Sequence, residues 1–134
     1  MKLRVVIADD ESLSRERLRH LLRDDPQVEI VAECANGKEA VETIKATSPD
    51  LLFLDVTMPE LDGFAVAETL RKDPSTASVP IIMLTGLSSQ FSRYAGLESG
   101  GTDFFTKPTS PSTLVSRIKT LLRETPEASS AGPN

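Results

Sequence analysis

The feature that most constrains the fold is a regular alternation of short apolar runs with stretches of helical periodicity. The apolar runs occupy residues 3–8, 28–32, 51–54, 79–84 and 102–106. Because these runs are mostly apolar rather than alternating, they are typical of strands covered on both faces. Strands that alternate with helices predict a (βα)5 chain, in which helices cover both faces of a parallel sheet.

The stretches between the runs carry helix signals. Helical periodicity follows Ser12 (a candidate cap), the Asn36–Gly37 turn, Gly63 and Ser110–Pro111, with a further helical stretch at residues 88–99. The last helix has the clearest apolar stripe, formed by Leu114, Ile118, Leu121 and Leu122. One helix is therefore expected after each strand.

A chain of 134 residues is long enough for one hydrophobic core and too short for two. We assign residues 1–124 to a single domain. Residues 125–134, TPEASSAGPN, lack apolar periodicity and are typical of a linker or a disordered tail. The sequence leaves open whether the chain acts alone or belongs to a longer protein.

Charge and cysteine content exclude several classes of protein. A net charge of −5 argues against nucleic acid or an anionic membrane as the main partner. No apolar run approaches the roughly 18 residues of a membrane span, and the first residues lack the layout of a signal peptide. The single cysteine, Cys34, excludes an internal disulfide and a thiolate zinc site. We therefore expect a cytoplasmic domain.

Polar side chains stand where the predicted strands end. Asp9 and Asp10 follow the first run, Asp55 the third, Thr85 the fourth and Lys107 the fifth. Each alone has a simple explanation, such as helix capping, a turn hydroxyl or a solvated lysine. Since ligands bind beyond the carboxyl ends of strands in open α/β sheets, one shared site explains the pattern better.

The residue types at this edge indicate phosphoryl chemistry. Clustered carboxylates repel one another unless a cation lies among them, and a cage of few carboxylates plus water suits Mg²⁺. A carboxylate beside Mg²⁺ can attack phosphorus, and a lysine and a hydroxyl can neutralise the product. Hydrolysis is a poorer match, because the only histidine, His20, falls among arginines in the first helix.

Four stretches resemble the receiver domain of two-component response regulators. VVIADDE, LLFLDVTMPELDGF, VPIIMLTG and GGTDFFTKP stand in the family's order and spacing, and the match covers residues 3–123. The resemblance implies a doubly wound five-stranded parallel sheet with the flavodoxin-like order 2-1-3-4-5. It also implies a phosphoprotein switch in two-component or phosphorelay signal transduction that controls an output partner or domain.

By this resemblance, Asp55 is the phosphoacceptor and receives a phosphoryl group from a histidine kinase or a histidine phosphotransfer protein. Asp10 would ligate Mg²⁺ or Mn²⁺ directly, with Asp9 acting through water. Asp55 itself and the backbone carbonyl of Thr57 would complete the protein's metal ligands.

The resemblance also assigns a switch. Lys107 would pair with the phosphoryl group, and Thr85 would close onto it. Phe104 would rotate inward behind Thr85, so that phosphorylation biases an existing equilibrium between inactive and active states.

Several positions depart from the family pattern. Phe104 lacks the hydroxyl of the common tyrosine, and Gly100–Gly101 replaces the usual Gly-Ala. Thr57 and Leu87 occupy positions that tune autodephosphorylation, yet neither carries an acid or an amide to orient an attacking water. We therefore predict a phosphoacceptor switch, not an enzyme acting on other substrates, that dephosphorylates itself slowly.

Two other functions are compatible with part of this pattern. Haloacid-dehalogenase-like phosphatases also use an aspartate at a strand end, but they need a second aspartate two residues later, where Thr57 stands. Receiver-like modules that bind partners without phosphorylation usually lose an acid or the lysine. Asp9, Asp10, Asp55 and Lys107 are all present here.

Partner surfaces follow from the expected layout. The basic face of the first helix is a candidate docking surface for the kinase, and a merely solvated helix face is the alternative. The fourth helix, fifth strand and fifth helix, with Phe91, Tyr94 and Phe104, would form an output surface that supports a homodimer. Tyr94 has a second interpretation as a half-buried packing residue.

Overall fold

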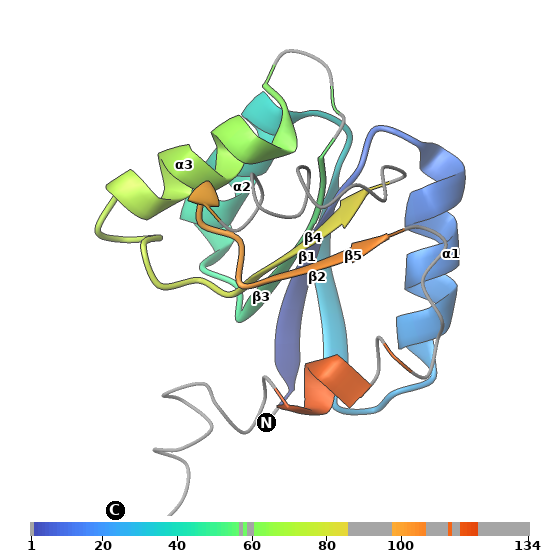
Figure 1. The fold of residues 1–134 in the computed structure, drawn as a ribbon. Coiled ribbons are helices and arrows are strands. Elements are labelled where there is room, and N and C mark those ends of the chain that lie inside the picture. The colour runs from blue at the N-terminus through green and yellow to red at the C-terminus, as the bar shows by residue number, and fades with distance from the viewer. Residues whose placement is uncertain are drawn as a thin grey trace, which may run out of the picture.

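A computed structural model of the protein describes residues 2–56, 58, 61–85, 98–106, 113 and 116–120. The strands are β1 (Leu3–Ala8), β2 (Val28–Cys34), β3 (Leu51–Asp55), β4 (Ile81–Thr85) and β5 (Asp103–Thr106). The helices are α1 (Ser12–Arg23), α2 (Gly37–Thr47) and α3 (Gly63–Lys72), and residues 116–120 are also helical. Figure 1 shows these elements as a sheet between helices.

The five strands form one parallel sheet in the order β2-β1-β3-β4-β5. This confirms the predicted doubly wound sheet. β3 lies at the centre, between β1 and β4, so the carboxyl ends of three neighbouring strands share one edge. In such a sheet this edge is where a ligand site is expected.

Helices cover both faces of the sheet, and each face has its own hydrophobic cluster. On one face α2 and α3 contribute Ile44 and Leu70 (Figure 1). On the other face α1 contributes Leu18 and Leu22, and Ile118 joins them from the last described helical residues. The sheet is therefore buried on both sides, which explains why its strands lack polar alternation.

The central strand β3 shows how an unbroken apolar run divides between the two faces. All five of its residues are buried. Leu52 and Leu54 belong to the cluster beneath α2 and α3, whereas Leu51 and Phe53 face the cluster on the α1 side. This is the two-residue period of a strand with an apolar partner on each face.

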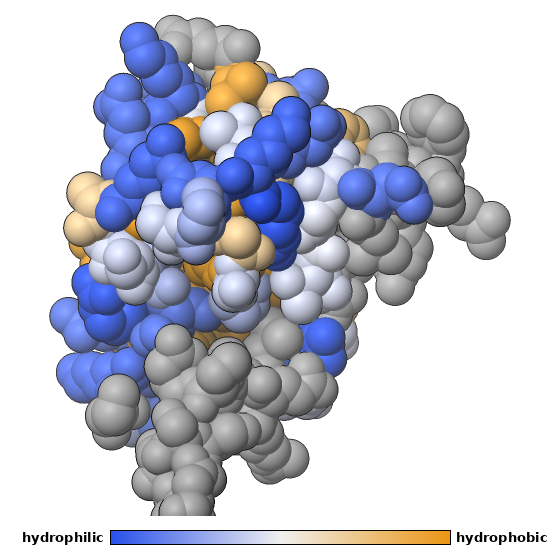
Figure 2. Space-filling view, turned by 90° about the vertical axis from the view of Figure 1, so that its left-hand side faces the viewer, coloured by the Kyte–Doolittle hydropathy of each residue, from blue (hydrophilic) through white to orange (hydrophobic). Residues whose placement is uncertain are grey.

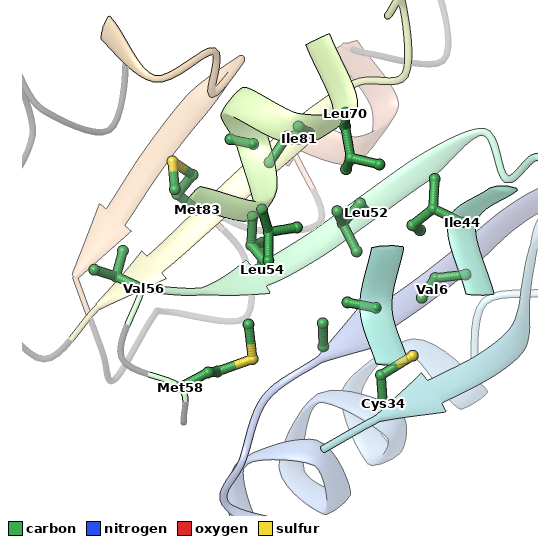
Figure 3. Packing of buried hydrophobic residues seen from close by; sticks show 14 residues of the cluster. Val6, Cys34, Ile44, Leu52, Leu54, Val56, Met58, Leu70, Ile81 and Met83 are labelled. Carbon is green, nitrogen blue, oxygen red and sulfur yellow. The ribbon is translucent and has the colours of Figure 1, made fainter. Parts of the chain in front are cut away.

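Two sulfur-containing side chains complete the cluster on the α2 and α3 face. Met58, shortly after β3, is only 7% exposed and extends into this cluster (Figure 3). Cys34, the last residue of β2, is buried in the same cluster, and burial raises the pKa of its thiol. Met58 thus anchors the chain shortly after Asp55, and its burial explains why an apolar residue stands at this position.

The strands reach further toward the carboxyl edge than the apolar runs predicted. β2 continues through Cys34, β3 through Asp55 and β4 through Thr85. These residues stay in strands because the hydrogen-bond ladder continues beyond them. The Val56 N–H, for example, donates to the Leu84 carbonyl at 2.9 Å. The polar residues are therefore held by the sheet itself.

The prediction that Ser12 caps the first helix is wrong. α1 begins at Ser12, and Glu11 occupies the cap position without a side-chain cap hydrogen bond. Asn36 and Asp62 are the side-chain caps of α2 and α3, accepting from backbone N–H groups at 2.8 and 2.9 Å. The predicted fourth helix, except its last two residues, and residues 125–134 lie outside the described residues.

Figure 2 shows the side of the molecule on which α2 and α3 lie. Its described surface is mostly hydrophilic, and hydrophobic side chains are confined to small separate areas. Among the described residues, Leu13 of α1 is the large hydrophobic side chain that stands exposed, at 54%. None of the described helices has the length and apolar content needed to cross a membrane.

Candidate functional site

Three carboxylates meet at the carboxyl edge of the sheet. Asp9 and Asp10 follow β1 directly, and Asp55 is the last residue of β3. One carboxylate oxygen from each of the three lies within 4.8 Å of the others. Asp9 and Asp55 are buried, at 4% and 5% exposure, whereas Asp10 is exposed. The structure thus brings together the three acids that the sequence predicted to converge.

Asp9 is held by its backbone and its side chain. Its N–H donates to the Cys34 carbonyl at 3.0 Å, which continues the pairing of β1 with β2. Its Oδ1 accepts from the Glu11 N–H at 2.9 Å, and its carbonyl oxygen accepts from Arg15 Nη1 of α1. These contacts fix the turn between β1 and α1, so that Asp10 is presented at the surface.

Asp55 is fixed by the close approach of the helix that follows it. The Gly63 N–H donates to the Val56 carbonyl at 2.9 Å. A Cβ at Gly63 would lie 2.4 Å from the Asp55 carbonyl oxygen, so no larger residue fits there without moving backbone. Glycine at the start of α3 therefore lets the helix pack directly against the end of β3.

A second glycine brings α2 close to the same region. A Cβ at Gly37, the first residue of α2, would lie 1.8 Å from the Leu61 carbonyl oxygen. Both contacts are between backbone groups, which cannot move aside as a flexible side chain would. The segment after Asp55 is therefore enclosed by the starts of two helices, and neither glycine was singled out for this role in the sequence.

Thr85 stands beside the acidic cluster. It ends β4, is fully buried, and follows Leu84, whose register partner in β3 is Asp55. Its partner on the other side is Thr106, the last residue of β5. Lys107 follows Thr106 in the sequence but, like Thr57 and Leu87, lies outside the described residues. For Phe104 only the backbone, in β5, is described.

The donor set fits a hard divalent cation. Carboxylate oxygens are the ligands that Mg²⁺ prefers, and only a few are needed because Mg²⁺ retains water. Three carboxylates in a site where two are buried repel one another strongly. A cation among them relieves this repulsion, so the geometry favours binding of Mg²⁺ or Mn²⁺.

One contributor to the site was missed in the sequence. Arg15 donates to the Asp9 carbonyl and pairs with Glu33 of β2, Nε to Oε1, at 3.6 Å. Arg19 pairs with the same carboxylate at 2.9 Å. The available signal was Glu33, a charged residue just beyond an apolar run. Part of the basic face of α1 therefore supports the site from within the chain.

A doubly wound parallel sheet with buried acids at its carboxyl edge defines a class of phosphate- or metal-binding domains. The response regulator receiver domain family matches residues 5–119, and the chain belongs to this family. Receiver domains work in two-component signalling, in which they interact with histidine kinases or phosphotransfer proteins and generally use Mg²⁺.

Two relatives illustrate the sequence similarity. The chain is 42% identical, over 129 residues, to the probable transcriptional regulator ycf27 of Porphyridium aerugineum. That match covers 96% of this chain and 52% of the relative. It is 36% identical to a protein-glutamate methylesterase/protein-glutamine glutaminase of Carboxydothermus hydrogenoformans, covering 92% of this chain and 34% of the relative. The chain thus spans between a third and about half of these relatives.

Solved structures show the same fold over nearly their whole length. A putative response regulator from Chloroflexus aurantiacus is 34% identical, with a TM-score of 0.85 over 91% of this chain and 98% of that one. The response regulator domain of Thermotoga maritima CheB is 26% identical, with a TM-score of 0.84 over 94% and 100%. Both matches extend over more than nine-tenths of this chain.

Proposed function

We propose that Asp55 is the phosphoacceptor of this receiver domain. The observation that carries the proposal is the position of Asp55: a buried carboxylate that ends the central strand, with Asp9 and Asp10 oxygens within 4.8 Å. An Asp55 oxygen attacks the phosphorus of a phosphohistidine, the N–P bond breaks, and the leaving imidazole takes up a proton. The product is an acyl phosphate on Asp55.

Each residue of the site has a separate task in this proposal. Asp10, Asp55 and the Thr57 carbonyl would hold Mg²⁺ or Mn²⁺, with Asp9 acting through water, and the metal would neutralise charge on the phosphoryl oxygens. Lys107 pairs with the phosphoryl group, and the Thr85 hydroxyl donates to it. Thr85 is buried next to the site and linked through strand register to β5, where Phe104 lies. These contacts bias the inactive–active equilibrium.

The chain is proposed to act as a switch rather than as an enzyme with its own substrate. Without an acid or amide at Thr57 and Leu87, the aspartyl phosphate hydrolyses slowly. A pulse-chase with radiolabelled phosphoryl donor and Mg²⁺ measures its lifetime. Loss of the label within seconds would contradict slow hydrolysis, whereas retention over minutes supports it.

The proposed phosphodonor is a cytoplasmic histidine kinase or phosphotransfer protein that docks beside α1. The arginines of α1 are only partly occupied within the chain: Arg19 pairs with Glu33, whereas Arg17 is exposed. The proposed homodimer would use the surface of the fourth helix, β5 and the fifth helix. Size exclusion of the phosphorylated and unphosphorylated chain tests that association.

The deciding experiment is intact mass spectrometry after incubation with acetyl phosphate and Mg²⁺. Wild type is expected to gain one base-labile phosphoryl adduct, and Asp55→Asn is expected to gain none. Asp62→Asn is the matched control, because Asp62 is exposed and asparagine preserves its cap on α3. An adduct on Asp55→Asn, or none on wild type, would overturn the proposal.

A further inference from the structure

Arg71, in the last turn of α3, bonds to two segments that are distant in sequence. Its Nε donates to the Gly100 carbonyl at 2.9 Å. Its Nη1 donates to the Val79 carbonyl at 2.6 Å and the Ala77 carbonyl at 3.1 Å. The side chain is half-buried, and burial lowers the pKa of its guanidinium, which remains protonated. One side chain thus supplies donors to three backbone carbonyls.

The two segments that Arg71 holds are the approaches to β4 and β5. Ala77 and Val79 precede β4, which begins at Ile81. Gly100 precedes β5, which begins at Asp103 (Figure 1). Arg71 therefore links α3 to the segments just before both strands, at the edge of the sheet opposite Asp55.

The aliphatic part of the Arg71 side chain also lies close to the Gly100 backbone. Gly100 has a φ of +117°, a conformation that residues with side chains rarely adopt. A Cβ at this position would lie 2.6 Å from Arg71 Cγ. The aliphatic part of Arg71 therefore packs directly on the Gly100 backbone, which the bare carbonyl contact alone would not require.

The turn held by Arg71 is connected at once to the strand ladder. The Thr102 N–H donates to the Ile81 carbonyl at 2.7 Å, and the Ile81 N–H donates to Thr102 Oγ1 at 2.9 Å. From there the register runs from Ile82 opposite Asp103 to Thr85 opposite Thr106. A short, continuous ladder therefore connects the residues after Gly100 to the carboxyl edge.

β5 depends on this anchor more than the other strands do. It is the last strand of the sheet and pairs with β4 alone. The carboxylates of the site come from β1 and β3, which pair with each other. The residue after β5 is Lys107, the proposed phosphoryl partner. Asp9, Asp10 and Asp55 thus belong to strands that do not pair with β5, whereas Lys107 follows β5 directly in the sequence.

We infer that Arg71 is a positioning residue for phosphoryl acceptance, which sets β5 against β4 at the carboxyl edge, where Thr85 ends β4 and Lys107 follows β5 in the sequence. The inference rests on the proposed function of Asp55. It predicts that loss of Arg71 slows phosphorylation but leaves Mg²⁺ binding unchanged, since the metal ligands lie on strands that Arg71 does not hold. A general loss of protein stability would instead lower the phosphorylation rate and the Mg²⁺ affinity together.

The experiment compares wild type, Arg71→Met and Arg71→Lys in the 134-residue chain, each checked for folding by circular dichroism. Phosphorylation by acetyl phosphate is followed by intact mass, and Mg²⁺ affinity is followed by calorimetry. Arg71→Met is expected to slow phosphorylation about ten-fold, because small misplacements of a charged group are costly in such reactions. Arg71→Lys keeps the charge but reaches fewer carbonyls. Its phosphorylation rate is expected to lie between those of wild type and Arg71→Met.

The matched control is Arg4→Met. Arg4 also donates to two backbone carbonyls, of Thr47 and Ser48, at 2.7 and 3.1 Å, but it holds the end of α2 and not β5. The Arg4→Met variant is expected to be phosphorylated by acetyl phosphate at the wild-type rate.

A wild-type rate in Arg71→Met, an equal slowing in Arg4→Met, or a parallel loss of Mg²⁺ affinity would each overturn the inference. If Arg71→Met does not fold, the comparison of Arg71→Lys with wild type decides in the same way. If wild type itself forms no adduct, the proposed function of Asp55 fails first, and this result is distinct from the others.

Discussion

The two edges of the sheet differ in how their charged side chains are arranged. At the carboxyl edge, like charges gather: Asp9, Asp10 and Asp55 have oxygens within 4.8 Å of one another. At the amino edge, the cations Arg4 and Arg71 are matched with backbone carbonyls of nearby loops. Hydrogen bonds to backbone carbonyls stabilise the two cations where they lie, whereas gathered like charge favours binding of a cation. The carboxyl edge is therefore suited to bind a cation, and the amino edge is suited to stabilise the fold.

The largest expected effect breaks the carboxyl edge through its backbone. Gly63→Ala places a Cβ 2.4 Å from the Asp55 carbonyl oxygen, and neither backbone can move aside easily. We expect a loss of about 2–3 kcal/mol in the free energy of unfolding, as for other overpacked sites. Urea denaturation measures it, with the exposed Glu68→Ala of the same helix as control. Equal stability of the two variants would contradict the close packing.

The next effect tests the amino edge. Arg4→Met removes charge-assisted hydrogen bonds to the Thr47 and Ser48 carbonyls, so we expect a loss of about 1.5 kcal/mol. The exposed Lys2→Met is the control for loss of a positive charge near the amino terminus. The same urea titration applies. A loss no greater than that of the control would show that these carbonyls are equally well served by water.

A smaller effect of opposite sign is expected at the carboxyl edge. In the presence of a chelator, Asp10→Asn removes one of the three clustered charges. The chain should gain on the order of 1 kcal/mol, because water screens the repulsion between the exposed Asp10 and the two buried acids. With saturating Mg²⁺, wild type is expected to regain the advantage, because binding stabilises the folded state. Glu42→Gln, exposed on α2, serves as control, and a Mg²⁺-independent ranking would contradict the shared cation site.

The smallest effect concerns Asp73, the carboxylate at the end of α3, two residues after Arg71. The Ser75 N–H and hydroxyl, and then Lys45, hold the pKa of Asp73 below its usual 3.8. Its contribution to stability is therefore present above pH 3.8 and is lost as the pH falls through the lower pKa of the folded state. Asp73→Asn should be slightly less stable than wild type at neutral pH, and the two should converge in acid. A constant difference across this range of pH would contradict the shifted pKa.

Much of the fold was predictable from local pattern. Residues 3–8 and 51–54 were recognisable as strands because a parallel sheet covered on both faces leaves unbroken apolar runs. The convergence of Asp9, Asp10 and Asp55 followed from topology, since parallel strands end at one edge. The expectation of a divalent cation among them followed from residue type.

What the sequence did not reveal depends on contacts between distant backbone groups. The donors of Arg4 and Arg71 reach carbonyls of ordinary residues, such as Thr47 and Val79, that carry no signal of their own. The extension of β3 through Asp55 depends on continued pairing with β4, which local composition does not encode. The tight approaches at Gly37 and Gly63 likewise depend on where other elements lie.

Cys34, the only cysteine of the chain, is 1% exposed at the end of β2. Alkylating reagents attack the thiolate, so a thiol that is both shielded and hard to ionise reacts only when its surroundings open. The unmodified protein therefore carries its own reporter of local opening, one strand away from the acids of the site. Labelling rates measured with and without Mg²⁺ or acetyl phosphate will show how far occupancy of the site tightens the neighbouring sheet.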